Sequence, residues 1–187
     1  MFYALHTNKG AWCSRHINRY LAARGWPPAT LHAFYPHGMA DLTRALHQQL
    51  AAKTLTNTKL VGVSLSSKIG QLLHARLVLL PPQAENLRLC YRTGALSPWR
   101  LDNAKAAYHV ANMFWQAVGC TVTNGNAYTK RTLLAKIIWQ ADLVWLGDAS
   151  PHFANTHQFI DNALAKTKNQ GQKWGKLVQP ILTRIKI

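Results

Sequence analysis

The stretch that decides how the first half of this 187-residue chain is interpreted is Leu72-Leu73-His74-Ala75-Arg76-Leu77-Val78-Leu79-Leu80. It is a short, mostly apolar run that Pro81-Pro82 ends, and a run of this kind is consistent with a buried β-strand. Similar short runs predict further strands at residues 2–7, 31–35, 59–66 and 87–91. We therefore predict that the first half of the chain contains a β-sheet.

Helices accompany these predicted strands. Apolar residues at Met39, Leu42, Leu46 and Leu50 recur at i, i+3, i+7 and i+11, which predicts a helix from about Met39 to Ala52. A shorter helix is expected over residues 14–24. Residues 1–95 are thus predicted to form a mixed α/β subdomain that resembles a ferredoxin-like or RNA-recognition sheet.

The second half has clear helix signals. Ser97-Pro98 and Ser150-Pro151 each place a serine N-cap before a proline at the first helical position. Gly119 and Gly147 end two apolar-periodic segments, as glycine often does at a helix C-terminus. Residues 96–187 are predicted to form a basic, three-helix subdomain, so the fold class expected for the whole chain is α+β.

Charge is the most unusual property of the composition. The chain has 22 Lys and Arg against six Asp and Glu, a formal net charge of +16. Such an excess favours a polyanionic partner. The shortage of carboxylates argues against two-metal nucleases and paired-carboxylate glycosidases, which need converging acids. The sequence also lacks the G-x-x-x-x-G-K-[ST] and G-x-G-x-x-G loops, so no cofactor is expected.

Three groups of residues are the predicted nucleic-acid contacts, because each combines cations with an aromatic side chain, a neighbouring histidine or a helix start. They are Arg15 and Arg19 on the first helix; Lys130 and Arg131 after the Asn124-Gly125-Asn126 turn; and Lys166, Lys168, Lys173, Trp174 and Lys176 in the tail.

Cysteines and histidines give little sign of a metal site. The three cysteines are widely spaced, which indicates a reducing compartment, and the cytoplasm is the expected location. Cys13 and His16 have a C-x-x-H spacing that no second pair completes, so no metal is predicted. His152 and His157 are interpreted as surface or capping residues.

No apolar run approaches the length of a membrane span, so no membrane partner is expected.

One stretch resembles the type I-F CRISPR RNA-processing endoribonuclease family, locally and over about residues 42–80. The matching motifs are Leu46-His47-Gln48-Gln49-Leu50, Val61-Gly62-Val63-Ser64-Leu65 and Ile69-Gly70-Gln71-Leu72-Leu73. The family's arginine-rich helix and its closing segment with the catalytic tyrosine have no counterpart here. The resemblance implies that His47 would be a general base acting on an RNA 2′-hydroxyl, and it favours RNA over DNA.

The function expected from the sequence is that of a basic, non-catalytic nucleic-acid-binding protein, a CRISPR-associated subunit of a nucleoprotein assembly with other protein subunits as partners. Two alternatives stay open. One is a metal-independent endoribonuclease that uses His47, and the other is an interaction module for an acidic protein partner.

Overall fold

The computed structural model describes residues 19, 21–27, 30–37, 39–62, 64–95, 100–120 and 125–167. These residues form helices and connecting turns and contain no strand. The elements are α3 (Thr30–Phe34), α4 (Met39–Asn57), α5 (Leu65–Val78), η1 (Pro81–Gln83), α6 (Ala84–Ala95), α7 (Arg100–Ala117), α8 (Gly125–Gly147) and η2 (Pro151–Phe153), followed by a helix over residues 154–167.

The predicted α+β fold class is wrong. The opening stretch, residues 72–80, lies mostly in α5; residues 87–91 lie in α6; and residues 31–35 largely coincide with α3. Of the strand expected at residues 59–66, residues 59–62 and Ser64 lie between α4 and α5, and residues 65–66 are the first residues of α5. The strand expected at residues 2–7 lies outside the described residues, as does most of the helix expected over residues 14–24.

Helix α5 begins where Ser64 acts as its N-cap. The Ser64 side chain accepts a hydrogen bond from the backbone N–H of Ser67 at 3.1 Å, which satisfies one of the amides that a helix start leaves unpaired. Along α5, the buried apolar residues Ile69, Leu72, Leu73 and Leu77 then follow helical spacing. The run is apolar because it is the inner face of a helix, and not because it is a central strand.

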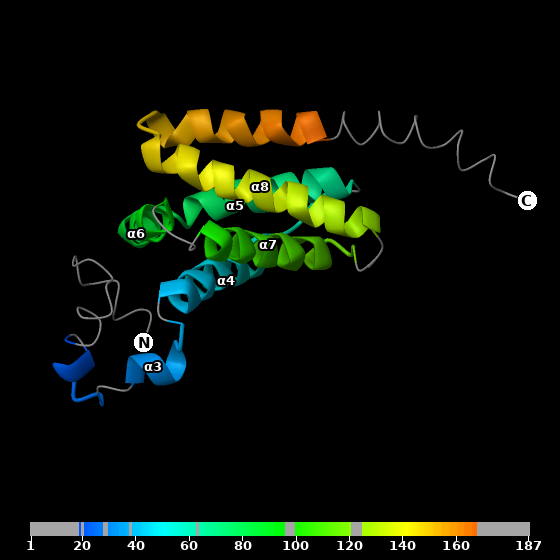
Figure 1. Ribbon diagram of the computed structural model, residues 1–187. Helices are drawn as coiled ribbons and strands as arrows, with labels where there is room; N and C mark the ends of the chain where they lie inside the picture. Colours follow the sequence, from blue (N-terminus) through cyan, green and yellow to red (C-terminus); the bar gives the residue numbers. More distant parts are fainter. Residues whose placement is uncertain are drawn as a thin grey trace, which may run out of the picture.

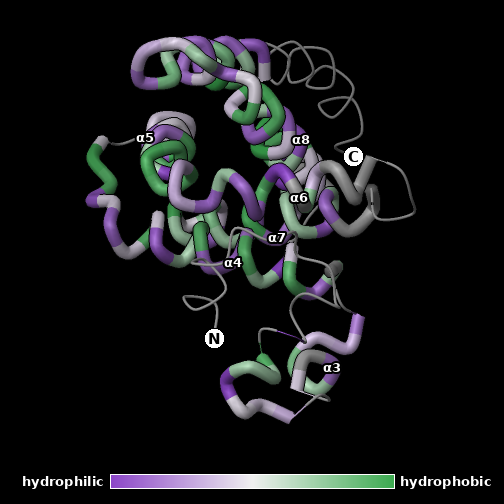
Figure 2. Tube along the Cα trace, turned by 90° about the vertical axis from the view of Figure 1, so that its left-hand side faces the viewer, coloured by the Kyte–Doolittle hydropathy of each residue, from purple (hydrophilic) through white to green (hydrophobic). Residues whose placement is uncertain are grey.

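The helices pack in layers around α7. Helix α7 contacts α4 on one side and α8 on the other, while α5 packs against α4 and α6 packs against α7. Helix 154–167 lies along α8 on the side away from α4, and α3 lies apart from the stack, beyond α4 (Figure 1). Hydrophobic residues gather where α4, α5, α7 and α8 adjoin (Figure 2).

One hydrophobic cluster joins the two halves of the chain. It includes Leu46 of α4, Leu72 of α5, Phe114 of α7, Ile138 of α8 and Ile160 of helix 154–167. Residues on both sides of position 95 therefore share a core. The division into residues 1–95 and 96–187 as separate subdomains stays a prediction.

Helix 154–167 is anchored at its start by Asp148. The Asp148 carboxylate accepts hydrogen bonds from the backbone N–H groups of Ser150 and Thr156 and from both of their hydroxyls. These bonds lower the pKa of Asp148, so the carboxylate is charged at neutral pH.

Among the described helices, none is both long and apolar enough to cross a membrane.

Candidate functional site

The centre of the molecule holds a buried ion pair. Arg76, from α5, lies 2% exposed among the apolar side chains of the core, and Asp142, from α8, is fully buried. The two guanidinium Nη atoms donate to the two carboxylate oxygens, with Nη2 to Oδ2 at 2.9 Å. This fork-to-fork geometry is the strongest arrangement available to an arginine and a carboxylate.

Two further side chains complete a cluster of His47, Arg76 and Asp142, which are buried, and Tyr91, which is partly buried. The hydroxyl of Tyr91, from α6, donates to Asp142 Oδ2 at 2.8 Å. Arg76 Nη2 lies 3.2 Å from Nδ1 of His47, from α4. Four helices that are separated along the chain thus meet at one carboxylate and one guanidinium.

Burial keeps His47 neutral. It lowers the pKa of His47 to about 4; the negative charge of Asp142 acts against this shift and the positive charge of Arg76 reinforces it. A guanidinium has donors only, so His47 Nδ1 accepts from Arg76 and the ring hydrogen resides on Nε2. His47 is therefore neutral near pH 7.

Asp142 also shifts the pKa values of Arg76 and Tyr91. Burial alone would lower the pKa of Arg76, but the charge of Asp142 and its hydrogen bonds more than offset this, and the net direction is upward. The pKa of Tyr91 is raised well above 10 by burial first and by Asp142 second. The cluster is therefore one cation and one anion with two neutral partners.

The cluster is rich in N–H donors. His47 Nε2, Arg76 Nε and Trp145 Nε1 are buried and find no hydrogen-bond partner in the part of the chain that the structure describes. Trp145 lies one turn after Asp142 on α8. Because His47 and Arg76 are at most 2% exposed, they do not present a catalytic surface to a large substrate. The arrangement serves to join helices.

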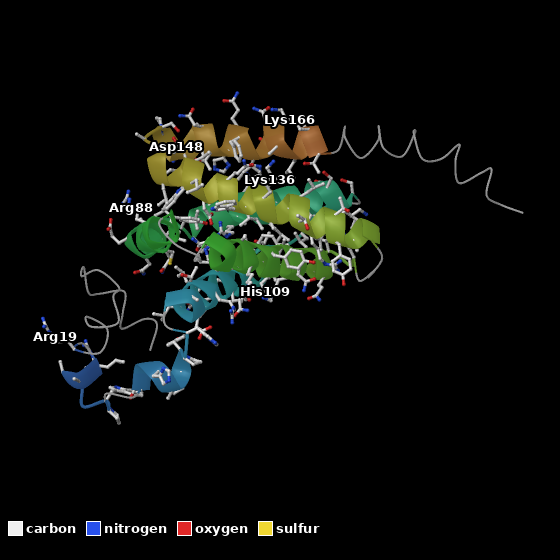
Figure 3. The ribbon with its side chains drawn as sticks, in the orientation of Figure 1. Arg19, Arg88, His109, Lys136, Asp148 and Lys166 are labelled. Atoms are coloured by element: carbon white, nitrogen blue, oxygen red, sulfur yellow. The ribbon has the colours of Figure 1, made fainter. Side chains whose placement is uncertain are left out.

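The four predicted nucleic-acid contacts that the structure describes do not gather at one place (Figure 3). Arg19 and Lys166 are exposed and lie at opposite ends of the molecule (Figure 3). Lys130 lies over the ring of Trp115, 5.8 Å from its centroid. Arg131 is buried, and its Nε donates to Asn112 Oδ1 at 2.8 Å. Five predicted contacts fall outside the described residues: Arg15, Lys168, Lys173, Trp174 and Lys176.

Sequence reasoning missed Arg76, Tyr91 and Asp142. A signal for two of them was present, since Arg76 and Asp142 are each flanked on both sides by apolar residues at helical spacing. A charge on the apolar face of a helix must be paired to be buried. The two opposite charges in two apolar helices could have been matched to each other.

The fold and this cluster define an all-α protein, within its described residues, whose helices are tied together by an internal ion pair. Residues 102–171 match the family model described as COQ9. Three curated relatives, from rat, cow and human, carry the name ubiquinone biosynthesis protein COQ9, mitochondrial. The rat protein is 39% identical over 57 residues, and the bovine and human proteins are each 37% identical over 57 residues. In each case the match covers 30% of this chain and 18% of the relative, so the match spans about a fifth of the length of these relatives.

These matches overturn the resemblance to the CRISPR endoribonuclease family and the function derived from it. The sequence similarity points to the COQ9 family. The residues that match the family model include most of α7, all of α8 and helix 154–167. The predictions of nucleic-acid binding, of an RNase using His47, of an acidic-protein module and of nucleoprotein partners are wrong on this evidence. The error arose because short apolar motifs such as Leu46-His47-Gln48-Gln49-Leu50 occur in many amphipathic helices, and because positive charge does not specify a partner.

Proposed function

We propose that this protein contributes to ubiquinone biosynthesis. The observation that carries the proposal is the match of residues 102–171 to the COQ9 family model. The relatives that align with this chain are named for the same process. The matched segment includes α7, α8 and helix 154–167, which together supply much of the hydrophobic core.

The role we propose is that of an accessory protein and not of a catalyst. The ionisable side chains that the fold brings together most closely, Arg76 and Asp142, are at most 2% exposed and are paired with each other. They stabilise the fold and do not reach a substrate. We further propose a cytoplasmic location, which cell fractionation with an antibody to the protein would test.

The test is genetic. Deleting the gene in its own organism is expected to lower ubiquinone, measured by mass spectrometry of extracted quinones, and the intact gene is expected to restore it. Asp142→Ala should fail to restore the quinone because it breaks the internal ion pair. Glu85→Ala, which removes an exposed carboxylate paired with Arg88, should restore it fully. An unchanged ubiquinone level in the deletion strain would overturn the proposal.

A further inference from the structure

A second polar cluster lies where α5 meets helix 154–167. His74 Nδ1 and His157 Nδ1 are 2.6 Å apart, and the two rings are nearly parallel, at 16°, with centroids separated by 4.8 Å. His74 Nε2 lies 2.9 Å from Asp161 Oδ1. Asp161 is one turn after His157 on the same helix.

The positions of the hydrogens follow from these contacts. The carboxylate of Asp161 only accepts, so His74 carries a hydrogen on Nε2 and a lone pair on Nδ1. His157 must then donate its Nδ1–H to that lone pair. The two Nδ1 atoms are 2.6 Å apart, a hydrogen-bond distance, so a hydrogen shared between the two nitrogens accounts for the contact.

This hydrogen bond tolerates one positive charge but not two. The pair can take up a first proton, because one Nδ1–H still points at the lone pair of the other Nδ1. A second proton puts a hydrogen on both Nδ1 atoms. Two N–H groups and two positive charges would then face each other at 2.6 Å, which is strongly repulsive.

The element joined by this contact is connected to α8 through a strained turn. His152 and Phe153, at the entrance of helix 154–167, have φ angles of 51° and 58°, in the left-handed region that non-glycine residues rarely adopt. Asp148 and the ring contact of Phe153 with Trp145 hold this turn in place. A strained junction favours movement of the helix once its other contacts weaken.

The helix and α5 run antiparallel along this contact. Near one end of this contact, His74 of α5 meets His157 and Asp161 of the helix. Four residues earlier on α5, the backbone of Gly70 lies close to Leu164, because a Cβ added at Gly70 would be 3.4 Å from Leu164 Cδ1. Ile160, between these two points, is fully buried. The histidine pair therefore lies beside the apolar residues Ile160 and Leu164 of the same helix.

We propose that the His74–His157 pair is a pH-sensitive latch, which holds helix 154–167 against α5 near neutral pH and releases it when both imidazoles are charged. The titratable groups that face His157 are His74 from α5, Asp148 from the turn after α8 and Asp161 from its own helix.

The direction of the switch follows from these groups. Burial lowers the pKa of His157, and the charge of His74 lowers it further, while the two carboxylates oppose both effects. The net direction is downward from 6.5, so the second protonation takes place in acid. A group whose pKa is lowered in the closed state binds its proton more readily when released, so acid opens the latch.

NMR of the full chain between pH 8 and pH 4.5 tests the proposal. We expect the imidazole C–H signals of His74 and His157 to titrate in two coupled steps, as interacting sites do. Amide-exchange protection of helix 154–167, corrected for the intrinsic effect of pH, should fall by up to about tenfold per pH unit between about 6.5 and the lower step. Protection of α4 in the same spectra is the internal reference.

Three variants and one control separate a latch from a structural contact. His74→Gln and His157→Gln should each abolish the pH dependence of protection in helix 154–167. Asp161→Asn should move the lower step to more acidic pH, because the carboxylate stabilises the doubly charged pair. His109→Gln, an exposed histidine on α7, should behave as the original chain (Figure 3). Independent single-step titrations of His74 and His157, or an unchanged pH dependence in His157→Gln, would overturn the proposal.

Discussion

Arg76 and Asp142 lie 66 positions apart in the chain, yet they form a bidentate ion pair in which neither residue is more than 2% exposed. Burying two charges is costly unless their geometry is good and their remaining polar atoms find partners. Here Tyr91 and His47 supply two of those partners. The pair fixes the relative positions of α5 and α8, and through its neighbours those of α4 and α6.

Removing one member of this pair should be severe. Asp142→Ala leaves the Arg76 guanidinium buried without a counter-charge, and we expect it to lower the free energy of unfolding by about 3–5 kcal/mol. Urea denaturation followed by circular dichroism measures the loss. The matched control is Glu85→Ala, which removes an exposed carboxylate paired with Arg88 and should cost about 0.2–1 kcal/mol. Equal effects in the two variants would contradict the importance of burial.

The hydroxyl of Tyr91 can be tested by itself. Tyr91→Phe keeps the ring and removes one of the two donors to Asp142 Oδ2, the other being Arg76 Nη2. We expect a loss of about 1.5–3 kcal/mol, the usual contribution of a hydrogen bond to a charged group. Tyr128→Phe is the control, since Tyr128 is 61% exposed and its variant should have the same urea midpoint as the original chain. No difference between the two variants would show that the hydroxyl of Tyr91 contributes nothing to stability.

His47 should make stability depend on pH. Its pKa is about 4 in the folded protein and near 6.5 when exposed, so the unfolded chain binds more protons between these two values. Stability from this residue is complete above about pH 6.5 and falls as the pH drops toward about 4, by an amount on the order of 3 kcal/mol. His47→Gln should show a shallower loss in urea denaturation at pH 7, 5.5 and 4.5. Parallel pH profiles for the two proteins would exclude His47 as the source.

Gly70 controls how closely helix 154–167 approaches α5. A single methyl group at Gly70 would meet Leu164 at an ordinary contact distance of 3.4 Å, and alanine favours a helix interior over glycine by about 1 kcal/mol. We therefore expect Gly70→Ala to stabilise the protein by up to about 1 kcal/mol. Gly70→Val adds volume to the same contact and should destabilise it by about 1–3 kcal/mol. A thermal melt of each variant distinguishes these signs, and stabilisation by both would contradict close packing at this point.

The sequence predicted the long helices better than the fold class. The periodicity from Met39, the Ser-Pro start at Ser150 and the Gly147 stop correspond to features of α4, helix 154–167 and α8. Residues 72–80 were misinterpreted because a short apolar run does not distinguish a buried strand from a buried helix. The capping bond from Ser64 decides in favour of a helix, but it is a single local signal.

Of the four residues in the cluster of His47, Arg76, Tyr91 and Asp142, only His47 was predicted as a site residue. That prediction rested on the resemblance to an endoribonuclease family, which is wrong. The partners of His47 come from α5, α6 and α8, so their proximity depends on tertiary packing that no local pattern contains. The same holds for His74 and His157, which are 83 positions apart. Charge composition predicted a polyanionic partner, although the buried pair shows that individual charges can be used to hold the fold together.

The separation of Arg76 from Asp142 also constrains the order of events during synthesis on the ribosome. Helix α5 emerges long before α8, and until Asp142 follows, the Arg76 guanidinium is more stable in water than inside a core. The early helices therefore gain little from closing over Arg76 before α8 arrives. The nascent chain is expected to stay open at this point, as a substrate for chaperones, until the residue that neutralises its buried charge has been made.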